Sequence, residues 1–373
     1  MKEGVLLISM PFADASFPSL ALSQLKAILR EKAGICCDLL YLNMAFRNFT
    51  GRSEIYDRVN AYTLFGEWPF GEDLFGADWA ESDRGGISFM ERIRPLGLEN
   101  PEPARSDLRV MRSCAGPFLD KWMAAIPWDR YGVIGFTSVY FQQVASLALA
   151  RRIKKAYPEK IIAFGGANCN EATDKALLKL FPFIDWIFCG QADCSFPKAV
   201  LSWCKHPSNI PEKIQGVSYR DHGAVMTQGS GESESLDRLP VPDFEDFKAG
   251  LETWAPDIQS PMIPIELSRG CWWGRRSQCI FCGVNHNMLF FRSKSPERAL
   301  DEIRTVVGRY GIQKIYITDS ILKTGYFKTL LPACCLTRRD EVTDRKRIAE
   351  SNASRPERAV HRKGGAPAAD FSR

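Results

Sequence analysis

Short apolar runs alternate with stretches of helical periodicity through most of the first 206 residues. The apolar runs have the length of buried strands, and between them apolar side chains recur every three or four positions. The expected strands are residues 5–10, 36–42, 132–137, 160–164 and 183–188, and the expected helices are residues 19–31, 142–157, 170–180 and 196–204. Strands that alternate with helices in this way predict an α/β fold built on a doubly wound parallel sheet.

The same pattern divides the chain into segments. The first domain, residues 1–206, is interrupted at 43–130 by a stretch rich in aromatic residues, glycine and charge, which we expect to form an insertion of short helices. Residues 207–262 are expected to be a hairpin and a polar linker. A second series covers 263–332, with strands at 263–267 and 313–318 and helices at 296–310 and near 326–331. Residues 333–373 have no sustained period and few large apolar side chains, which predicts a disordered tail.

Composition is typical of soluble globular proteins. Hydrophobic residues make up 45% and charged residues 25% of the 373 positions. No apolar run approaches the roughly 18 residues of a membrane span, and the N-terminus becomes polar too soon for a signal peptide. We therefore expect a cytoplasmic protein without a membrane partner. The net charge is +5, and most of the surplus follows residue 336, where acidic and basic residues are interleaved, so we expect no nucleic-acid partner.

Three of the twelve cysteines lie close together in the sequence and are candidate metal ligands. A long chain without an export signal is not expected to build a disulfide scaffold, and most cysteines here lie in apolar segments as small buried side chains. Cys271, Cys279 and Cys282 instead share one loop directly after the strand at 263–267. Thiolates bind iron–sulfur clusters and zinc. Three ligands leave one iron of a cluster open, whereas a structural zinc site needs a fourth ligand, for which His286 is a candidate.

The residues around these cysteines resemble the cluster loop of radical S-adenosylmethionine enzymes, which follows the first strand of a partial (β/α)6 barrel. The common form of that loop has three residues between the first two cysteines, and this chain has seven. Residues 268–273 (Ser-Arg-Gly-Cys-Trp-Trp) and 283–286 (Gly-Val-Asn-His) resemble a cobalamin-binding subgroup that matures ribosomally synthesised peptides (RiPPs), often as C-methyltransferases. The resemblance covers about residues 1–332 and implies that the first domain is cobalamin-binding-like.

The resemblance also implies roles for individual residues. Cys271, Cys279 and Cys282 would hold a 4Fe–4S cluster, and Phe281 would pack near the adenine of S-adenosylmethionine. Asp319, which follows the strand at 313–318, would contact the amino group of S-adenosylmethionine. An Asp in that position is also a common helix cap, so this second interpretation stays open.

Cobalamin would bind at the carboxyl ends of the first domain's strands. Gly165 and Gly166 follow one of these strands and would let the macrocycle approach the backbone, or they form an ordinary turn. The implied reaction begins when the cluster, reduced by an electron donor such as flavodoxin or ferredoxin, cleaves S-adenosylmethionine to a 5′-deoxyadenosyl radical. Methylcobalamin would then supply a methyl group to a carbon of a precursor peptide.

The second series is shorter than this resemblance requires. A partial barrel of the superfamily needs about six βα units, and the sequence offers two before its pattern ends near residue 333, as in a truncated or frameshifted chain. The strands at 263–267 and 313–318 would then leave apolar faces and one edge open. The alternative interpretation is a catalytically inactive remnant that binds a metal ion or an iron–sulfur cluster, and the sequence leaves open whether the chain is an enzyme.

Overall fold

The computed structural model describes residues 4–61, 65–82, 102–207, 213–232, 234–277, 279–282, 290–312 and 314–334. The chain forms two compact units, Met1–Leu322 and Lys323–Arg373. In the second unit the 3-10 helix η8 spans Thr324–Phe327, so it overlaps the first residues of the helix expected near 326–331. The disordered tail was expected from residue 333, but residues 333 and 334 are helical; the rest of it, from residue 335 onward, and His286 lie outside the described residues.

All five expected strands of the first domain are present in one parallel sheet. They are β1 (Gly4–Ser9), β2 (Cys37–Tyr41), β3 (Tyr131–Thr137), β4 (Ile161–Gly165) and β5 (Trp186–Phe188). Their order is β2-β1-β3-β4-β5, with each strand parallel to its neighbour. The expected hairpin also forms, as β6 (Val217–Asp221) and β7 (Ala224–Met226). It pairs antiparallel with β5, so it extends the sheet to seven strands.

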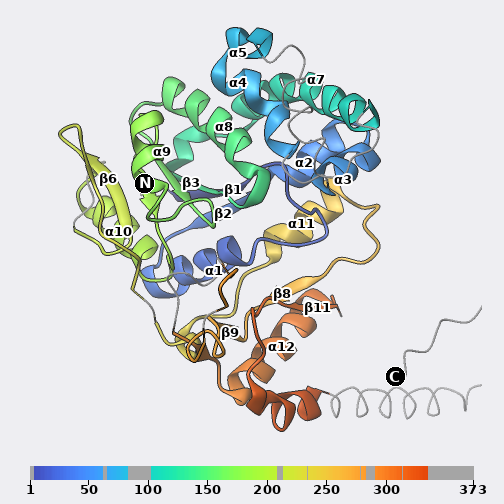
Figure 1. The fold of residues 1–373 in the computed structure, drawn as a ribbon, viewed down its shortest axis with the longest axis vertical. Helices are drawn as coiled ribbons and strands as arrows, with labels where there is room; N and C mark the ends of the chain where they lie inside the picture. The colour runs from blue at the N-terminus through green and yellow to red at the C-terminus, as the bar shows by residue number, and fades with distance from the viewer. Residues whose placement is uncertain are drawn as a thin grey trace, which may run out of the picture. The chain divides into compact units, whose positions relative to one another are not determined.

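Helices cover both faces of this sheet (Figure 1). Alternate residues of β1 point to opposite sides, Leu6 and Ile8 into one apolar cluster and Val5 and Leu7 into the other. The first cluster includes α8 (Gln143–Ala156) and α9 (Asp174–Leu180), and the second includes α1 (Leu20–Ile28), α10 (Ser195–Lys205) and α11 (Glu245–Trp254). Because both faces are covered, all seven residues of β3 are buried. The doubly wound α/β fold is confirmed, whereas α11 lies where only a linker was expected.

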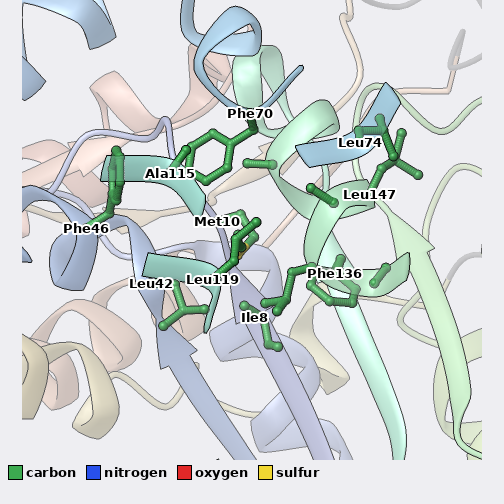
Figure 2. Close-up of a cluster of buried hydrophobic side chains, with 14 of the residues drawn as sticks. Ile8, Met10, Leu42, Phe46, Phe70, Leu74, Ala115, Leu119, Phe136 and Leu147 are labelled. Atoms are coloured by element: carbon green, nitrogen blue, oxygen red, sulfur yellow. The ribbon is translucent and has the colours of Figure 1, made fainter. Parts of the chain in front are cut away.

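The insertion between β2 and β3 is helical, as expected, and it is part of the core. Its elements are α2 (Leu42–Phe49), α3 (Ser53–Ala61), η2 (Phe65–Phe70), α4 (Gly71–Phe75), α5 (Ala77–Ser82) and α7 (Glu102–Ala125). With 24 residues, α7 is much longer than the short helices we expected. Figure 2 shows Phe46, Phe70 and Leu119 of this insertion packed around Ile8 and Phe136 of the sheet. The insertion therefore contributes one wall of the hydrophobic core.

The second series begins with β8 (Ile263–Ile265), followed by β9 (Ser268–Arg269), β10 (Arg292–Ser293), α12 (Pro296–Tyr310) and β11 (Ile315–Ile317). β11 pairs parallel with β8, and α12 connects them in the expected order. α12 begins at the expected residue because the Ser295 side chain accepts the N–H of Arg298 and Pro296 occupies the first turn. β8 is buried, whereas β11 is open to solvent, with Tyr316 52% exposed. The expected apolar exposure is thus present on one of the two strands.

Among the helices that the structure describes, none combines the length and the apolar character needed to cross a membrane.

A half-buried carboxylate joins the insertion to α8. The Glu67 side chain accepts the N–H groups of Gln143 (3.0 Å) and Val144 (2.6 Å) in the first turn of α8. Burial raises the pKa of Glu67 to about 7, although the two N–H groups lower it in part. In the folded chain Glu67 therefore binds its proton more tightly than in the unfolded chain.

This difference predicts how stability depends on pH. Between about pH 4.5 and pH 7 the folded state holds the Glu67 proton while the unfolded state loses it, so the free energy of unfolding should fall as pH rises. Urea unfolding at several pH values should show that Glu67→Gln flattens this decline, because it removes the titrating group. An unchanged slope in the Glu67→Gln variant would contradict the prediction.

Candidate functional site

A cavity of about 550 Å³ lies at the carboxyl ends of the parallel strands. The strand order reverses between β1 and β3, and in sheets of this order ligands bind at such a reversal, outside the carboxyl ends. The cavity also extends beneath the strand ends, between α1 and the sheet. Its lining there is apolar or small: Leu7, Leu22, Gly135, Ala163, Phe188 and Phe196. This combination of an apolar interior and a polar mouth is typical of small-molecule sites.

The second series forms the opposite wall of the same cavity. Glu266, Ser268, Arg269 and Gly270 follow β8, and Thr318 and Ser320 follow β11. Because β8 and β11 are parallel, their carboxyl ends lie at one edge of their small sheet. The carboxyl edges of both sheets therefore border one cavity. The loop that holds the three cysteines begins in this wall, directly after Gly270.

A charged network stands where the two walls meet. The Arg269 guanidinium pairs with Asp193 of the β5–α10 loop, and its Nε lies 2.7 Å from both carboxylate oxygens of Glu266. Burial raises the pKa of Glu266, and the adjacent Arg269 charge partly offsets this rise. Sequence reasoning gave Arg269 and Asp193 no such role, because they lie 76 positions apart in the chain.

Asp319 connects the ends of β8 and β11. Its carboxylate accepts the Leu267 N–H at 2.8 Å and the Ser268 hydroxyl at 2.5 Å. These bonds hold the start of β9 in place, so Asp319 stabilises a strand end instead of capping a helix. Its contact with the amino group of S-adenosylmethionine stays a prediction.

The cysteine loop is closed at its base by a short ladder. β9 and β10 pair antiparallel, and the Lys294 N–H donates to the Leu267 carbonyl at 2.8 Å. Cys271, Cys279 and Cys282 are half-buried and form no disulfide. The Cys282 N–H donates to the Cys279 carbonyl in a tight turn, and the Gly274 N–H donates to Cys271 Sγ at 3.3 Å.

The structure does not bring the three thiols to one point. Across the described ranges, no group of three His, Cys, Asp or Glu side chains is placed to hold a metal ion. Phe281, between the last two cysteines, is 88% exposed. Binding of a cluster by these cysteines, and packing of Phe281 on an adenine, therefore remain predictions.

Both predicted glycines, Gly165 and Gly166, line the cavity, but only one of these positions requires glycine. Gly166 has φ +113°, and a Cβ atom there would lie 2.5 Å from the Ser138 carbonyl oxygen. The chain's own backbone thus requires glycine at this position. A Cβ atom on Gly165 would meet nothing closer than the Phe188 Cβ at 3.7 Å, an ordinary van der Waals contact, so a small side chain fits at this position.

Solved structures share this fold. No protein-family model and no curated protein matches the chain. The cobalamin-dependent S-adenosylmethionine radical enzyme OxsB, with aqua-cobalamin and S-adenosylmethionine bound, superposes with a TM-score of 0.51 at 14% identity, covering 85% of this chain and 34% of that one. The apo form of OxsB superposes with a TM-score of 0.50 at 15% identity, covering 87% of this chain and 35% of the OxsB chain. The radical S-adenosylmethionine methyltransferase TsrM from Kitasatospora setae, with tryptophan substrate and a cofactor analog bound, gives 0.48 at 14%, covering 91% and 52%.

The likeness to OxsB concerns the fold. The chain has a mixed α/β architecture similar to that of OxsB, with a mostly parallel seven-stranded sheet. It spans about a third of the length of the OxsB chains.

The two glycines give a matched test of this local geometry. Gly166→Ala should lower the free energy of unfolding by about 1–3 kcal/mol, because an L side chain is strained at this φ and meets backbone atoms. Gly165→Ala should change it by less than about 1 kcal/mol, since its Cβ has room. Urea unfolding of both variants checks this, and equal losses would contradict it.

Proposed function

We propose that this protein acts as a cobalamin-dependent radical S-adenosylmethionine methyltransferase whose substrate is a ribosomally synthesised precursor peptide. The observation that supports this most is the single cavity bordered by the carboxyl edges of both sheets, with the three-cysteine loop beginning in its wall. A cofactor bound at the carboxyl edge of one sheet would face a cofactor bound at the carboxyl edge of the other across this cavity. The peptide substrate, and a flavodoxin or ferredoxin as electron donor, are proposed from the resemblance of residues 268–273 to the peptide-maturing subgroup.

The cavity has features that suit cobalamin. Between α1 and the sheet its wall is apolar, and Gly135 and Ala163 keep it open below the strand ends. The planar aromatic base of a cobalamin could enter this part of the cavity, because both faces of the base would be buried against aliphatic and aromatic side chains. Backbone at Gly165 and in the loop 190–192 would border the macrocycle at the mouth. Bound cobalamin would supply a transferable methyl group.

The cysteine loop has the donors for an iron–sulfur cluster. Cys271, Cys279 and Cys282 are reduced thiols within one loop, and each is partly accessible. The Gly274 N–H points at Cys271 Sγ, and hydrogen bonds to ligand sulfurs are one means by which proteins tune cluster potentials. These residues would hold a 4Fe–4S cluster, which would supply an electron to bound S-adenosylmethionine. The chain's part is to hold both sites at one cavity and to limit the access of water.

Metal content tests the cluster. Anaerobic reconstitution of the full chain should give about four irons and four sulfides per protein. The triple variant Cys271→Ala, Cys279→Ala, Cys282→Ala should lose nearly all of this iron, because no thiolate ligands remain in the loop. Cys36→Ala is the matched control, since Cys36 is an exposed cysteine of the first domain. Zinc in place of iron, or full iron in the triple variant, would contradict the proposal.

Cobalamin retention tests the cavity. The full chain should carry hydroxocobalamin through a desalting column, and Gly165→Leu should reduce the bound amount at least about tenfold by filling space at the mouth. Gly308→Leu is the matched control, because Gly308 lies in α12 with open space around it and does not line the cavity. Free passage of cobalamin past the folded wild-type chain would contradict the proposal.

A further inference from the structure

Two arginines stand at the ends of the cysteine loop. In the β9–β10 ladder Arg269 lies directly opposite Arg292, so the chain leaves the ladder at one arginine and returns to it at the other. Like charges directly opposite on neighbouring strands repel each other. This repulsion is offset by the carboxylates of Glu266 and Asp193 on Arg269, and by one acceptor that both guanidinium groups share.

That acceptor comes from the β5–α10 loop of the large sheet. Gln191 Oε1 accepts Arg292 Nη2 at 2.6 Å and Arg269 Nη1 at 3.1 Å, and Asp193 pairs with Arg269. Arg292 Nη1 also donates to the Glu234 carbonyl at 3.0 Å. Only 14% of the Arg269 side chain and 9% of the Asp193 side chain are exposed. Charge-assisted bonds of this kind are strong when water is largely excluded.

The receiving loop is itself firmly held. The Cys189 N–H donates to the Gly216 carbonyl at 2.9 Å, and the Cys189 carbonyl accepts the Gly231 N–H at 3.0 Å. The backbone at Gly231 lies so close that a Cβ there would be 2.2 Å from the Gln191 carbonyl oxygen. Gln191 and Asp193 thus follow a residue, Cys189, whose backbone is hydrogen-bonded to Gly216 and to Gly231.

We propose that Gln191, Asp193, Arg269 and Arg292 form an arginine lock that holds both ends of the cysteine loop against the β5–α10 loop. The lock sets the separation between the cysteines and the cavity below the strand ends of the large sheet. Its four members are positioning residues, which act through the loop that they hold. The geometry stands by itself, and the purpose, a fixed distance between cluster and cobalamin, rests on the proposed function.

Hydrogen exchange on the full cofactor-free chain tests the lock directly. Gln191→Leu removes the shared acceptor, so amide exchange in β9, β10 and Lys294 should rise about tenfold while β1 and β3 stay protected. Gln191→Glu supplies a carboxylate to both arginines and should keep the exchange at or below the wild-type rate. Lys198→Met is the control, because it removes the exposed Lys198–Glu232 pair nearby. Equal exchange in the Leu and Glu variants, or no rise in Gln191→Leu, would overturn the lock.

Electron paramagnetic resonance of the chain loaded with both cofactors tests whether the arginine lock fixes the distance between cluster and cobalamin. Magnetic coupling between reduced cluster and cob(II)alamin depends steeply on their distance. Gln191→Leu should weaken or spread this coupling with iron content unchanged, and Gln191→Glu should restore the wild-type spectrum. An identical spectrum in all three chains would overturn the positioning role. A wild-type chain that binds no iron or no cobalamin would refute the proposed function and with it the purpose of the lock, while hydrogen exchange would still decide its geometry.

Discussion

Burial of both faces of the parallel sheet is the constraint from which the site follows. β3 has no exposed residue, because helices of the insertion and α8 cover one side and α1 and α10 cover the other. Such a sheet is accessible to a ligand only at its strand ends, where loops replace packed helices. The reversal of strand order between β1 and β3 opens that edge, and the cavity lies there. The position of the site is therefore a consequence of core packing, and the side chains around it decide what can bind.

The cysteine loop is held by another kind of force. Within this loop the side chains of Ile280 and Phe281 are exposed, so burial of these residues does not fix it. Hydrogen bonds and charges hold its base instead: Asp319 to Leu267 and Ser268 at one side, and Arg269 to Asp193 at the other. Segments with few buried apolar contacts open more readily than a core sheet does. The large sheet is thus the tightly packed wall of the cavity, and the cysteine loop is the part held mainly by polar contacts.

Gly165 and Gly166 are adjacent, yet the local backbone requires glycine at only one of the two positions. Both line the cavity, yet Gly166 is required by the close approach of Ser138, whereas Gly165 leaves space that a ligand could use. A side chain at position 166 would therefore affect the stability of the fold, whereas one at position 165 would affect mainly the space in the cavity. Asp319 makes a similar point, since a residue predicted to bind a ligand also holds two strands together.

Local periodicity by itself determined the five parallel strands, the helices between them and the start of α12, because burial on alternate faces and capping by Ser295 are properties of neighbouring residues. The three cysteines and their spacing were equally visible in the sequence. Only the tertiary structure decided that β6 and β7 extend the large sheet, that α11 packs on it, and that β9 pairs with β10 across the cysteine loop. It also placed Gln191 and Asp193 beside Arg269 and Arg292. These contacts join residues far apart in the chain, and their energies depend on which surfaces remain after the core has packed, which no local pattern records.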